Sequence, residues 1–424
     1  MILFKKIAQN PLFRITSLNS FSVIIKIGIG LITSKFLAIF VGPSGMALVG
    51  NFRNFISSIE GISTLGFQNG IVKYVAESEN DKPKIAKIIS TVFISLLIVA
   101  VVLSFVLFAF SEFWSHQIFG VNFQYSIAFR ALAIALPWYA TSIFLLSIIN
   151  GLHQYKRVIY INIIGNLIGL LVSVFMIFQY KTVGALLSIV ISPSILFFVT
   201  FYFINKEIPF FRSIKFSNFD FEIIKKLSSF SLMALVSSVI GPIVFLLIRQ
   251  FVIQKTGLEQ AGFWETINRI SSYYLMFATS VLSIYFLPKL VVAKDNQVTK
   301  SIFWSYYKSI IPVFIIGVVI IYFLRFFVIK TLFTKAFLPV TTLFFWQLIG
   351  DVFKVSSWIL GFNLLAKKMT IAFIITELFS LLLTYLFSFF FVSQYGIQGI
   401  VMAHALSYFI YLMVLGIYFR KSLF

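Results

Sequence analysis

The chain has 424 residues, of which 60% are hydrophobic and 18% aromatic, and its mean hydropathy is +1.01. A soluble domain has nowhere to bury that much apolar surface, so the composition indicates an all-α polytopic membrane protein. The net charge is +21, but the cations are spread over short loops and helices, which argues against nucleic acid as a partner. The absence of cysteine excludes disulfides, thiol catalysis and Cys-based metal sites.

Twelve segments are apolar over the ~20 residues that a helix needs to cross a bilayer. These predicted transmembrane helices cover residues 15–41, 44–72, 88–111, 125–150, 158–179, 183–204, 227–252, 260–288, 301–324, 339–365, 370–392 and 396–419. The longest inner connection, 205–226, is polar and contains Pro209. It predicts a cytoplasmic linker between an N-terminal lobe at 1–204 and a C-terminal lobe at 227–424.

The basic residues outside the spans fall unequally on the two sides of the membrane. Twenty-one Lys and Arg, among them Lys5, Lys6 and Arg212, lie in the connections assigned to the inner side, and six lie on the other side, including Arg249 at the end of a span. Connections rich in Lys and Arg stay in the cytoplasm, so both termini are predicted to be cytoplasmic. The longest outer connections, 112–124 and 325–338, are too short for a catalytic domain.

Three basic residues of the first half recur in the second half at one constant offset. The pairs are Arg53 and Arg269, Lys73 and Lys289, and Lys84 and Lys300. An offset close to half the chain length indicates duplication, and six spans per half insert both halves in the same orientation. In transporters built from such parallel repeats the substrate site lies at the interface between the halves, where Arg53 and Arg269 would face each other at similar depth.

Eight basic residues lie within the predicted spans or at their ends. They are Lys26, Lys35, Arg53, Arg130, Arg249, Arg269, Lys308 and Lys354. Only four acidic residues lie at that depth, namely Glu60, Glu265, Asp351 and Glu377. A cation in hydrocarbon is costly and normally faces a water-filled cavity or a partner charge, so the surplus predicts an anionic substrate. The alternative for each cation is a structural ion pair or snorkelling to the interface, most readily for Lys35, Arg130 and Lys308 near span ends.

Two of the intramembrane acids have nearby cations on the same predicted helix. Asp351 and Lys354 are three residues apart and can pair across one turn, and Glu265 can pair with Arg269 four residues later. Asp351, with Glu377 on the next helix, is also the best candidate for coupling transport to an H⁺ or Na⁺ gradient, because coupling needs a titratable or ion-binding acid. The three histidines lie on different segments and predict neither a metal site nor an acid–base set; they are His116, His153 and His404.

A series of short stretches carries a family resemblance that runs from about residue 20 to the last helix. They are Lys26-Ile27-Gly28 through Lys35, Gly42-Pro43-Ser44-Gly45, Asn51-Phe52-Arg53, Gly70 to Ala76, Phe230 to Leu235, Leu287-Pro288 and Trp346 to Val355. Taken in order they resemble Wzx-type flippases, especially the branch that moves O-antigen or enterobacterial common antigen units. These flippases belong to the multidrug/oligosaccharidyl-lipid/polysaccharide (MOP) exporter superfamily, which includes the MATE transporters.

The resemblance implies a V-shaped MATE-like fold of two six-helix lobes around a cationic cavity. It implies transport of an undecaprenyl-diphosphate-linked oligosaccharide from the cytoplasmic to the periplasmic leaflet of the bacterial inner membrane. It also implies no cofactor and no catalytic residue, with polysaccharide polymerase or assembly proteins as candidate partners beside the lipid bilayer. The charges that look family-type are Lys26, Lys35, Arg53, Arg130, Arg249, Lys308, Asp351, Lys354 and Glu377, whereas Glu60, Glu265 and Arg269 depart from the family pattern.

A MATE-like, cation-coupled antiporter of small organic molecules would share this fold and is the alternative function. An antiporter of organic cations predicts a net acidic cavity, whereas the spans of this chain hold more cations than acids. A membrane enzyme that handles the same lipid, such as a polymerase or ligase, would need a large periplasmic loop with catalytic residues. The sequence therefore predicts a transporter rather than an enzyme.

Overall fold

The computed structural model describes residues 11–78, 81–120, 125–206, 210 and 214–423, without the side chains of 11–17 and 229–230. Lys5, Lys6, Pro209 and Arg212, which enter the predicted orientation and linker, lie outside these residues. Throughout the described part of the chain the regular elements are helices, so the all-α prediction is confirmed.

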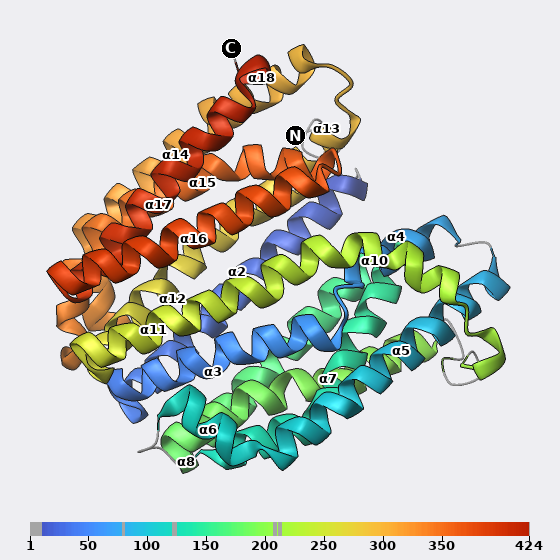
Figure 1. Ribbon diagram of the computed structural model, residues 1–424, viewed down its shortest axis with the longest axis horizontal. Helices are drawn as coiled ribbons and strands as arrows, with labels where there is room; N and C mark the ends of the chain where they lie inside the picture. The colour runs from blue at the N-terminus through green and yellow to red at the C-terminus, as the bar shows by residue number, and fades with distance from the viewer. Residues whose placement is uncertain (1–10, 79–80, 121–124, 207–209, 211–213, 424) are drawn as a thin grey trace, which may run out of the picture. The chain divides into compact units, whose positions relative to one another are not determined.

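The chain divides into two compact units (Figure 1). Unit 1 comprises Met1–Ile29 and Asn51–Ile243, and unit 2 comprises Gly30–Gly50 and Val244–Phe424. Three helices therefore contribute residues to both units, namely α2 (Pro11–Phe40), α3 (Gly42–Ser63) and α11 (Gly241–Thr256). The domain boundaries predicted above, at 204, 205–226 and 227, stay a prediction.

Unit 1 is built around α7, a helix whose sequence is apolar on nearly every side. Its remaining elements are α4 (Gln68–Glu77), α5 (Lys82–Ala109), α6 (Ser111–Phe119), α7 (Ser126–Gly151), α8 (Tyr155–Asn205), η1 (Phe216–Asn218), α10 (Phe221–Leu235) and η2 (Val236–Ile240). Helix α7 packs along α8, α5 and α4. Val92, Phe144 and Ile148 are buried in the resulting core, and removing such surface from water contributes ~25 cal/mol per Å².

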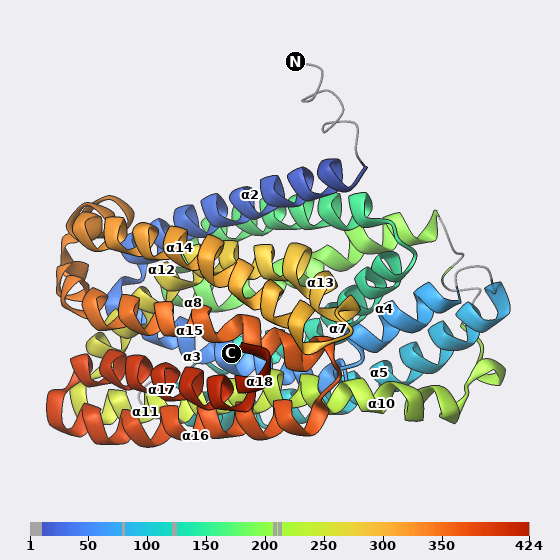
Figure 2. The same ribbon diagram turned by 90° about the horizontal axis from the view of Figure 1, so that it is seen from above.

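Unit 2 repeats this pattern of packed long helices. Its elements are α12 (Leu258–Val281), η3 (Leu282–Phe286), α13 (Leu287–Val292), α14 (Asn296–Leu332), η4 (Lys335–Leu343), α15 (Phe344–Ala366), α16 (Thr370–Tyr395), α17 (Ile397–Tyr418) and α18 (Arg420–Leu423). Helix α17 lies between α15 and α16, and α14 packs against α15 (Figure 2). Helix α12 also contacts α15 and α17, which matters for the polar groups described below.

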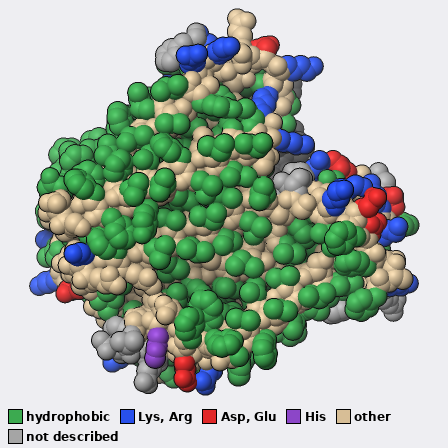
Figure 3. Space-filling view, viewed as in Figure 1, with side chains coloured by type: hydrophobic (Ala, Val, Ile, Leu, Met, Phe, Trp, Pro, Cys, Tyr) green, Lys and Arg blue, Asp and Glu red, His purple; other side chains and the backbone are tan. Residues whose placement is uncertain are grey.

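Ten helical stretches of the described chain are long and apolar enough to cross a membrane. One of them, α8, is 51 residues long and is broken at Lys181, where φ is +49°, so it holds the two predicted spans 158–179 and 183–204. The predicted span 44–72 corresponds to α3 and α4. On the face in Figure 3 hydrophobic side chains cover most of the surface, as lipid contact requires. The chain is a multi-pass membrane protein.

The helix boundaries repeat at nearly the offset that the charge pattern predicts. Helix α3 begins at Gly42 and α12 at Leu258, which are separated by the same offset as the basic pairs. His153 and Lys368 both have positive φ, +57° and +54°, at equivalent helix connections of the two halves. Lys181 and Gly396, with φ of +49° and +58°, likewise separate the last two long helices of each half. The duplication therefore extends from the charges to the backbone turns.

A glycine follows each of these last turns and allows the two helices to approach closely. A Cβ on Gly184 would lie 1.8 Å from the carbonyl oxygen of Met176, and one on Gly399 would lie 2.1 Å from that of Phe391. Both contacts are with backbone, which cannot move aside as a flexible side chain can. The same approach thus recurs in unit 1 and in unit 2.

We expect Gly184→Val and Gly399→Val each to lower the free energy of unfolding by about 1–3 kcal/mol, because the added atoms overpack against a carbonyl. Thermal unfolding of the purified protein in detergent measures the effect. Gly416→Val on α17 is the control, since a Cβ there meets nothing within 4 Å. Equal unfolding temperatures for all three variants would show that the close approach is not needed.

Candidate functional site

Helix α12 presents polar side chains on two faces within unit 2. Glu265, Arg269 and Tyr273 follow one another at four-residue spacing and therefore share one face of the helix. Ser271 and Tyr274 lie on the opposite side of the same helix. Polar groups at this depth are expensive unless other parts of the protein contact them, so each face indicates a built polar site.

On the first face, two arginines share one carboxylate. Arg249 of α11 donates from Nη1 to Glu265 Oε2 at 2.8 Å, and Arg269 donates from Nε to Glu265 Oε1 at 3.3 Å. Arg249 and Glu265 are only 2% and 3% exposed, and the Arg249 guanidinium lies 4.9 Å from the Trp264 ring centroid. The predicted pairing of Arg269 with Glu265 is confirmed. Nothing in the residue spacing indicates the shorter contact to Arg249, which comes from another helix.

Helices α2 and α3 complete this arginine–carboxylate cluster. A Cβ on Gly50 of α3 would lie 1.6 Å from Arg249 Nη1, so only glycine leaves room for the buried guanidinium. Arg269 Nη1 donates to Ser34 Oγ of α2 at 3.3 Å, and Ser34 is hydrogen-bonded to the Tyr273 hydroxyl at 2.7 Å. The cluster is thus held by four helices of unit 2.

On the second face of α12, the carboxylate of Asp351 is the centre of a hydrogen-bond network. Ser271 Oγ and the Tyr274 hydroxyl donate to Asp351 Oδ2 at 2.7 and 2.5 Å. His404 Nε2 of α17 lies 3.0 Å from Oδ1, and the Gln347 amide donates to both oxygens at 3.4 Å. Asp351 is completely buried, and these groups replace the water that a carboxylate loses on burial.

Asp351 and Lys354 do not form the direct ion pair that their spacing predicts. Within the described part of unit 2, the basic side chain that contacts the Asp351 carboxylate is the imidazole of His404. The Lys354 ammonium lies 5.0 Å from the Tyr408 ring centroid, and Asp351 and Glu377 are near enough to act on it electrostatically. The prediction that the histidines form no acid–base set missed this contact, because sequence spacing cannot show that α15 and α17 pack together.

Lys35 binds the end of a helix rather than an open site. Its Nζ donates to the carbonyl oxygens of Thr331 and Phe333, both at 2.9 Å, where α14 ends. The last carbonyls of a helix lack helical partners and carry the negative end of its dipole, so a lysine there stabilises the helix. In the structure, Lys35 therefore stabilises the end of α14.

Two other predicted cations, Arg130 and Lys308, are exposed at the protein surface. Arg130 donates from Nε to Ser111 Oγ at 3.1 Å and lies 3.5 Å from the Glu112 carboxylate, both at the start of α6. The Lys308 ammonium lies 5.8 Å from the Trp304 ring centroid. These positions fit the alternative of an interfacial or surface pair, which contributes ~0–1 kcal/mol.

Lys26 and Arg53 belong to unit 1. Lys26 is exposed on α2 and Arg53 is half-buried on α3. Glu60, two turns after Arg53 on α3, accepts a hydrogen bond of 2.5 Å from the Tyr139 hydroxyl of α7. The predicted role of Lys26 and Arg53 in substrate binding, and the predicted apposition of Arg53 and Arg269, stay predictions.

Comparison with known proteins identifies the family of the chain. Residues 12–291 match the family described as polysaccharide biosynthesis protein. The chain belongs to this family. The chain is 28% identical over 391 residues to the Lipid III flippase of Escherichia coli (strain K12). This match covers 92% of the chain and 94% of the relative. The Lipid III flippase of Shigella flexneri matches to the same extent.

Solved structures show the same fold at low identity. An inward-facing multidrug resistance MATE family transporter of the MOP superfamily has a TM-score of 0.77 at 14% identity, covering 94% of this chain and 97% of that one. An outward-facing transporter of that family has a TM-score of 0.73 at 15% identity, covering 98% and 96%. The MATE-like fold and the resemblance to MOP-superfamily flippases are confirmed. This polysaccharide biosynthesis protein is a transporter, not an enzyme.

We expect Glu265→Gln to lower the free energy of unfolding by about 3–5 kcal/mol, because it removes the carboxylate that the buried Arg249 and the half-buried Arg269 share. Thermal unfolding in detergent measures the loss. Glu259→Gln, at the exposed start of the same helix, is the matched control and should unfold like the wild type. An unchanged unfolding temperature for Glu265→Gln would contradict a structural ion cluster at this position.

Proposed function

We propose that this polysaccharide biosynthesis protein is a flippase for undecaprenyl-diphosphate-linked oligosaccharide, an O-antigen or common-antigen repeat unit. It carries the headgroup from the cytoplasmic to the periplasmic leaflet by alternating access through a cationic cavity. The similarity to Lipid III flippases over 92% of the chain supports this class of substrate. The proposal places the protein in the bacterial inner membrane with both termini cytoplasmic, as the distribution of Lys and Arg favours.

The observation that carries the proposal is the excess of cations within the membrane spans. Four acids share that depth with eight basic residues, and each acid has a local contact of its own. Glu265 serves two arginines, Asp351 contacts His404, Glu60 accepts from Tyr139, and Glu377 lies near Lys354. A diphosphate supplies the negative charge that this balance favours, through charge-assisted hydrogen bonds.

The physical task of the protein is to replace water around a diphosphate and a glycan. Moving such a headgroup through hydrocarbon would strip its charges and hydroxyls of their hydrogen bonds. Arginine binds phosphate with two donors in a fixed plane, whereas lysine acts as a mobile point charge. Without the surface residues Arg130 and Lys308, the cations nearer the inner side are Lys26 and Lys354, and those nearer the outer side are Arg53, Arg249 and Arg269. In our proposal the headgroup passes from the first set to the second.

Asp351 and His404 are the groups on which we base coupling to an H⁺ gradient. Histidine is the side chain that most readily changes charge near neutral pH, and here it contacts a fully buried carboxylate. Asp351 is contacted by Ser271 and Tyr274 from α12, Gln347 from α15 and His404 from α17, with Lys354 close by on α15. Tyr408 from α17 and Glu377 from α16 lie near Lys354. Protonation of this set changes the charge that α12, α15 and α17 share.

A MATE-like antiporter of small organic molecules is the second candidate, because the solved structures with this fold include MATE transporters. Such an antiporter requires a binding site of the opposite charge. An organic cation would bind where acids outnumber bases, and the spans of this chain show the opposite balance.

In liposomes containing a labelled polyprenyl-diphosphate glycan, we expect the wild type to move the label between leaflets. Lys26→Glu and Arg53→Glu should reduce the rate to that of protein-free liposomes, because a reversed charge repels the diphosphate. Lys255→Glu, on the exposed last turn of α11, should keep the wild-type rate. Normal translocation by Arg53→Glu would overturn the role of this residue. Transport of an organic cation with no movement of the glycan lipid would favour the antiporter.

We expect an imposed H⁺ gradient to accelerate glycan-lipid translocation by the wild type, and Asp351→Asn and His404→Gln to lose this acceleration. Their residual translocation without a gradient should persist, since neither residue is assigned to the diphosphate. Glu259→Gln, an exposed acid in the first turn of α12, should respond as the wild type does. A wild-type rate that is indifferent to both H⁺ and Na⁺ gradients would remove the coupling hypothesis.

A further inference from the structure

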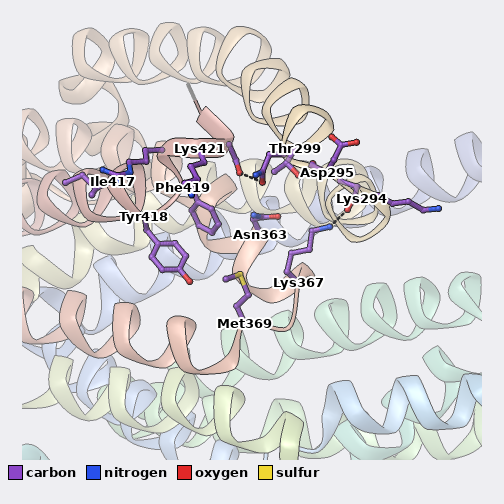
Figure 4. A pocket seen from close by; sticks show the side chains of 14 residues that line it. Lys294, Asp295, Thr299, Asn363, Lys367, Met369, Ile417, Tyr418, Phe419 and Lys421 are labelled. Atoms are coloured by element: carbon purple, nitrogen blue, oxygen red, sulfur yellow. Dashed lines mark hydrogen bonds between the residues drawn. The ribbon is translucent and has the colours of Figure 1, made fainter.

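A polar cavity lies in unit 2, where several helices begin or end. It has a volume of about 970 Å³ and is bounded by the start of α14, the turn from α15 to α16, and the end of α17 with α18 (Figure 4). The spans that border it end at Val292, Ala366 and Tyr418 and begin at Asn296 and Thr370. The cavity therefore lies at the level where the apolar spans meet the membrane surface.

The lining of this cavity is strongly cationic. Four basic side chains face one acid, and they are Lys294, Lys367, Arg420 and Lys421 against Asp295. The acid is already engaged, because Asp295 Oδ1 accepts from the Val298 N–H at 2.7 Å and caps α14. The first turn of the 37-residue helix α14 adds the positive end of its dipole. Both features favour an anion in the cavity.

Asn363 of α15 gives the cavity a specific polar contact. The residue is only 4% exposed and its side chain lines the cavity, yet its Oδ1 has no hydrogen-bond partner. A buried amide oxygen without a donor is costly, so a ligand that carries a hydrogen-bond donor would stabilise this site. Neighbouring polar groups are already used, since Ser422 donates to Asn296 at 2.8 Å and Lys367 donates to the Ala293 carbonyl.

Apolar side chains stand beside the cations. Ile417 and Tyr418 line the cavity and are 64% and 48% exposed. An aliphatic chain and a tyrosine at the membrane surface suit contact with an acyl chain and its glycerol backbone. A free phosphate ion would leave this surface unused, so the lining favours a phosphate that belongs to a lipid.

We propose that this cavity binds the headgroup of an anionic phospholipid with a hydroxyl donor, of which phosphatidylglycerol is the simplest. Lys294, Lys421 and Arg420 contact the phosphate, and Asn363 Oδ1 accepts from a headgroup hydroxyl. Basic pockets between spans at the cytoplasmic surface are known to suit such lipids. The site goes beyond the proposed transport function, because its ligand is a membrane lipid that is bound rather than moved.

Native mass spectrometry of the purified full-length protein tests the proposal, with phosphatidylglycerol, phosphatidylcholine and inorganic phosphate as separate probes. We expect retention of phosphatidylglycerol and a drop of at least tenfold in its affinity for the double variant Lys294→Ala/Lys421→Ala. Asn363→Leu, which keeps the branched skeleton but removes the amide, should weaken the binding of phosphatidylglycerol by about threefold. The double variant Lys330→Ala/Lys335→Ala removes two exposed lysines at and beyond the other end of α14 and should bind as the wild type does.

Three results would overturn the site as proposed. These are unchanged phosphatidylglycerol affinity in the Lys294→Ala/Lys421→Ala variant, phosphatidylcholine binding as tight as phosphatidylglycerol, and full displacement of the lipid by millimolar inorganic phosphate. Preferential binding of a polyprenyl diphosphate over phosphatidylglycerol would likewise assign the cavity to the transported lipid instead. Because the readout is lipid binding, it is independent of whether glycan-lipid translocation is observed.

Discussion

Ionised side chains inside a membrane must obtain from the protein the hydrogen bonds and counter-charges that water provides elsewhere. In unit 2 this requirement falls on α12. One face of the helix brings Glu265 to Arg249 and Arg269, and the opposite face brings hydroxyl donors to Asp351. The neighbouring helices are therefore fixed to α12 by polar contacts that leave a buried charge uncompensated when one partner is removed. Apolar packing alone would tolerate small shifts between neighbouring helices, whereas these polar contacts do not.

The same requirement connects the internal ion cluster to the chemistry of the proposed substrate. A diphosphate offers oxygen acceptors of the kind that Glu265 offers to Arg249 and Arg269. Internal pairing and the proposed headgroup binding thus depend on the same kind of guanidinium donor. The Glu265 carboxylate therefore shows what an anion needs in order to hold arginines inside the membrane, namely oxygen acceptors for both guanidinium groups.

The sequence predicts those parts of the structure that depend on local spacing. Glu265 and Arg269 are one turn apart on a single helix, and their contact follows from helix geometry. Contacts between helices are different, because spacing does not show which faces meet. Arg249 reaches Glu265 from another helix, and His404 reaches Asp351 from α17. The repeat offset was visible in the charges because duplicated helices keep their lengths and turns. The cavity at the ends of the helices had no sequence signature, since it is assembled from three separate connections.

The two polar regions of unit 2 differ in how completely the protein supplies hydrogen-bond partners for their polar groups. This difference affects what each region can bind. At the depth of the spans, the Asp351 carboxylate has four donors around it and Glu265 has two, so any ligand must compete with contacts already made. At the membrane surface, Asn363 has an unpartnered amide oxygen beside several cations, so a ligand completes the site instead. A ligand that must compete with existing contacts binds briefly and is released. A ligand that supplies a missing contact stays bound. The arrangement therefore fits a transported headgroup within the spans and a resident lipid at their ends.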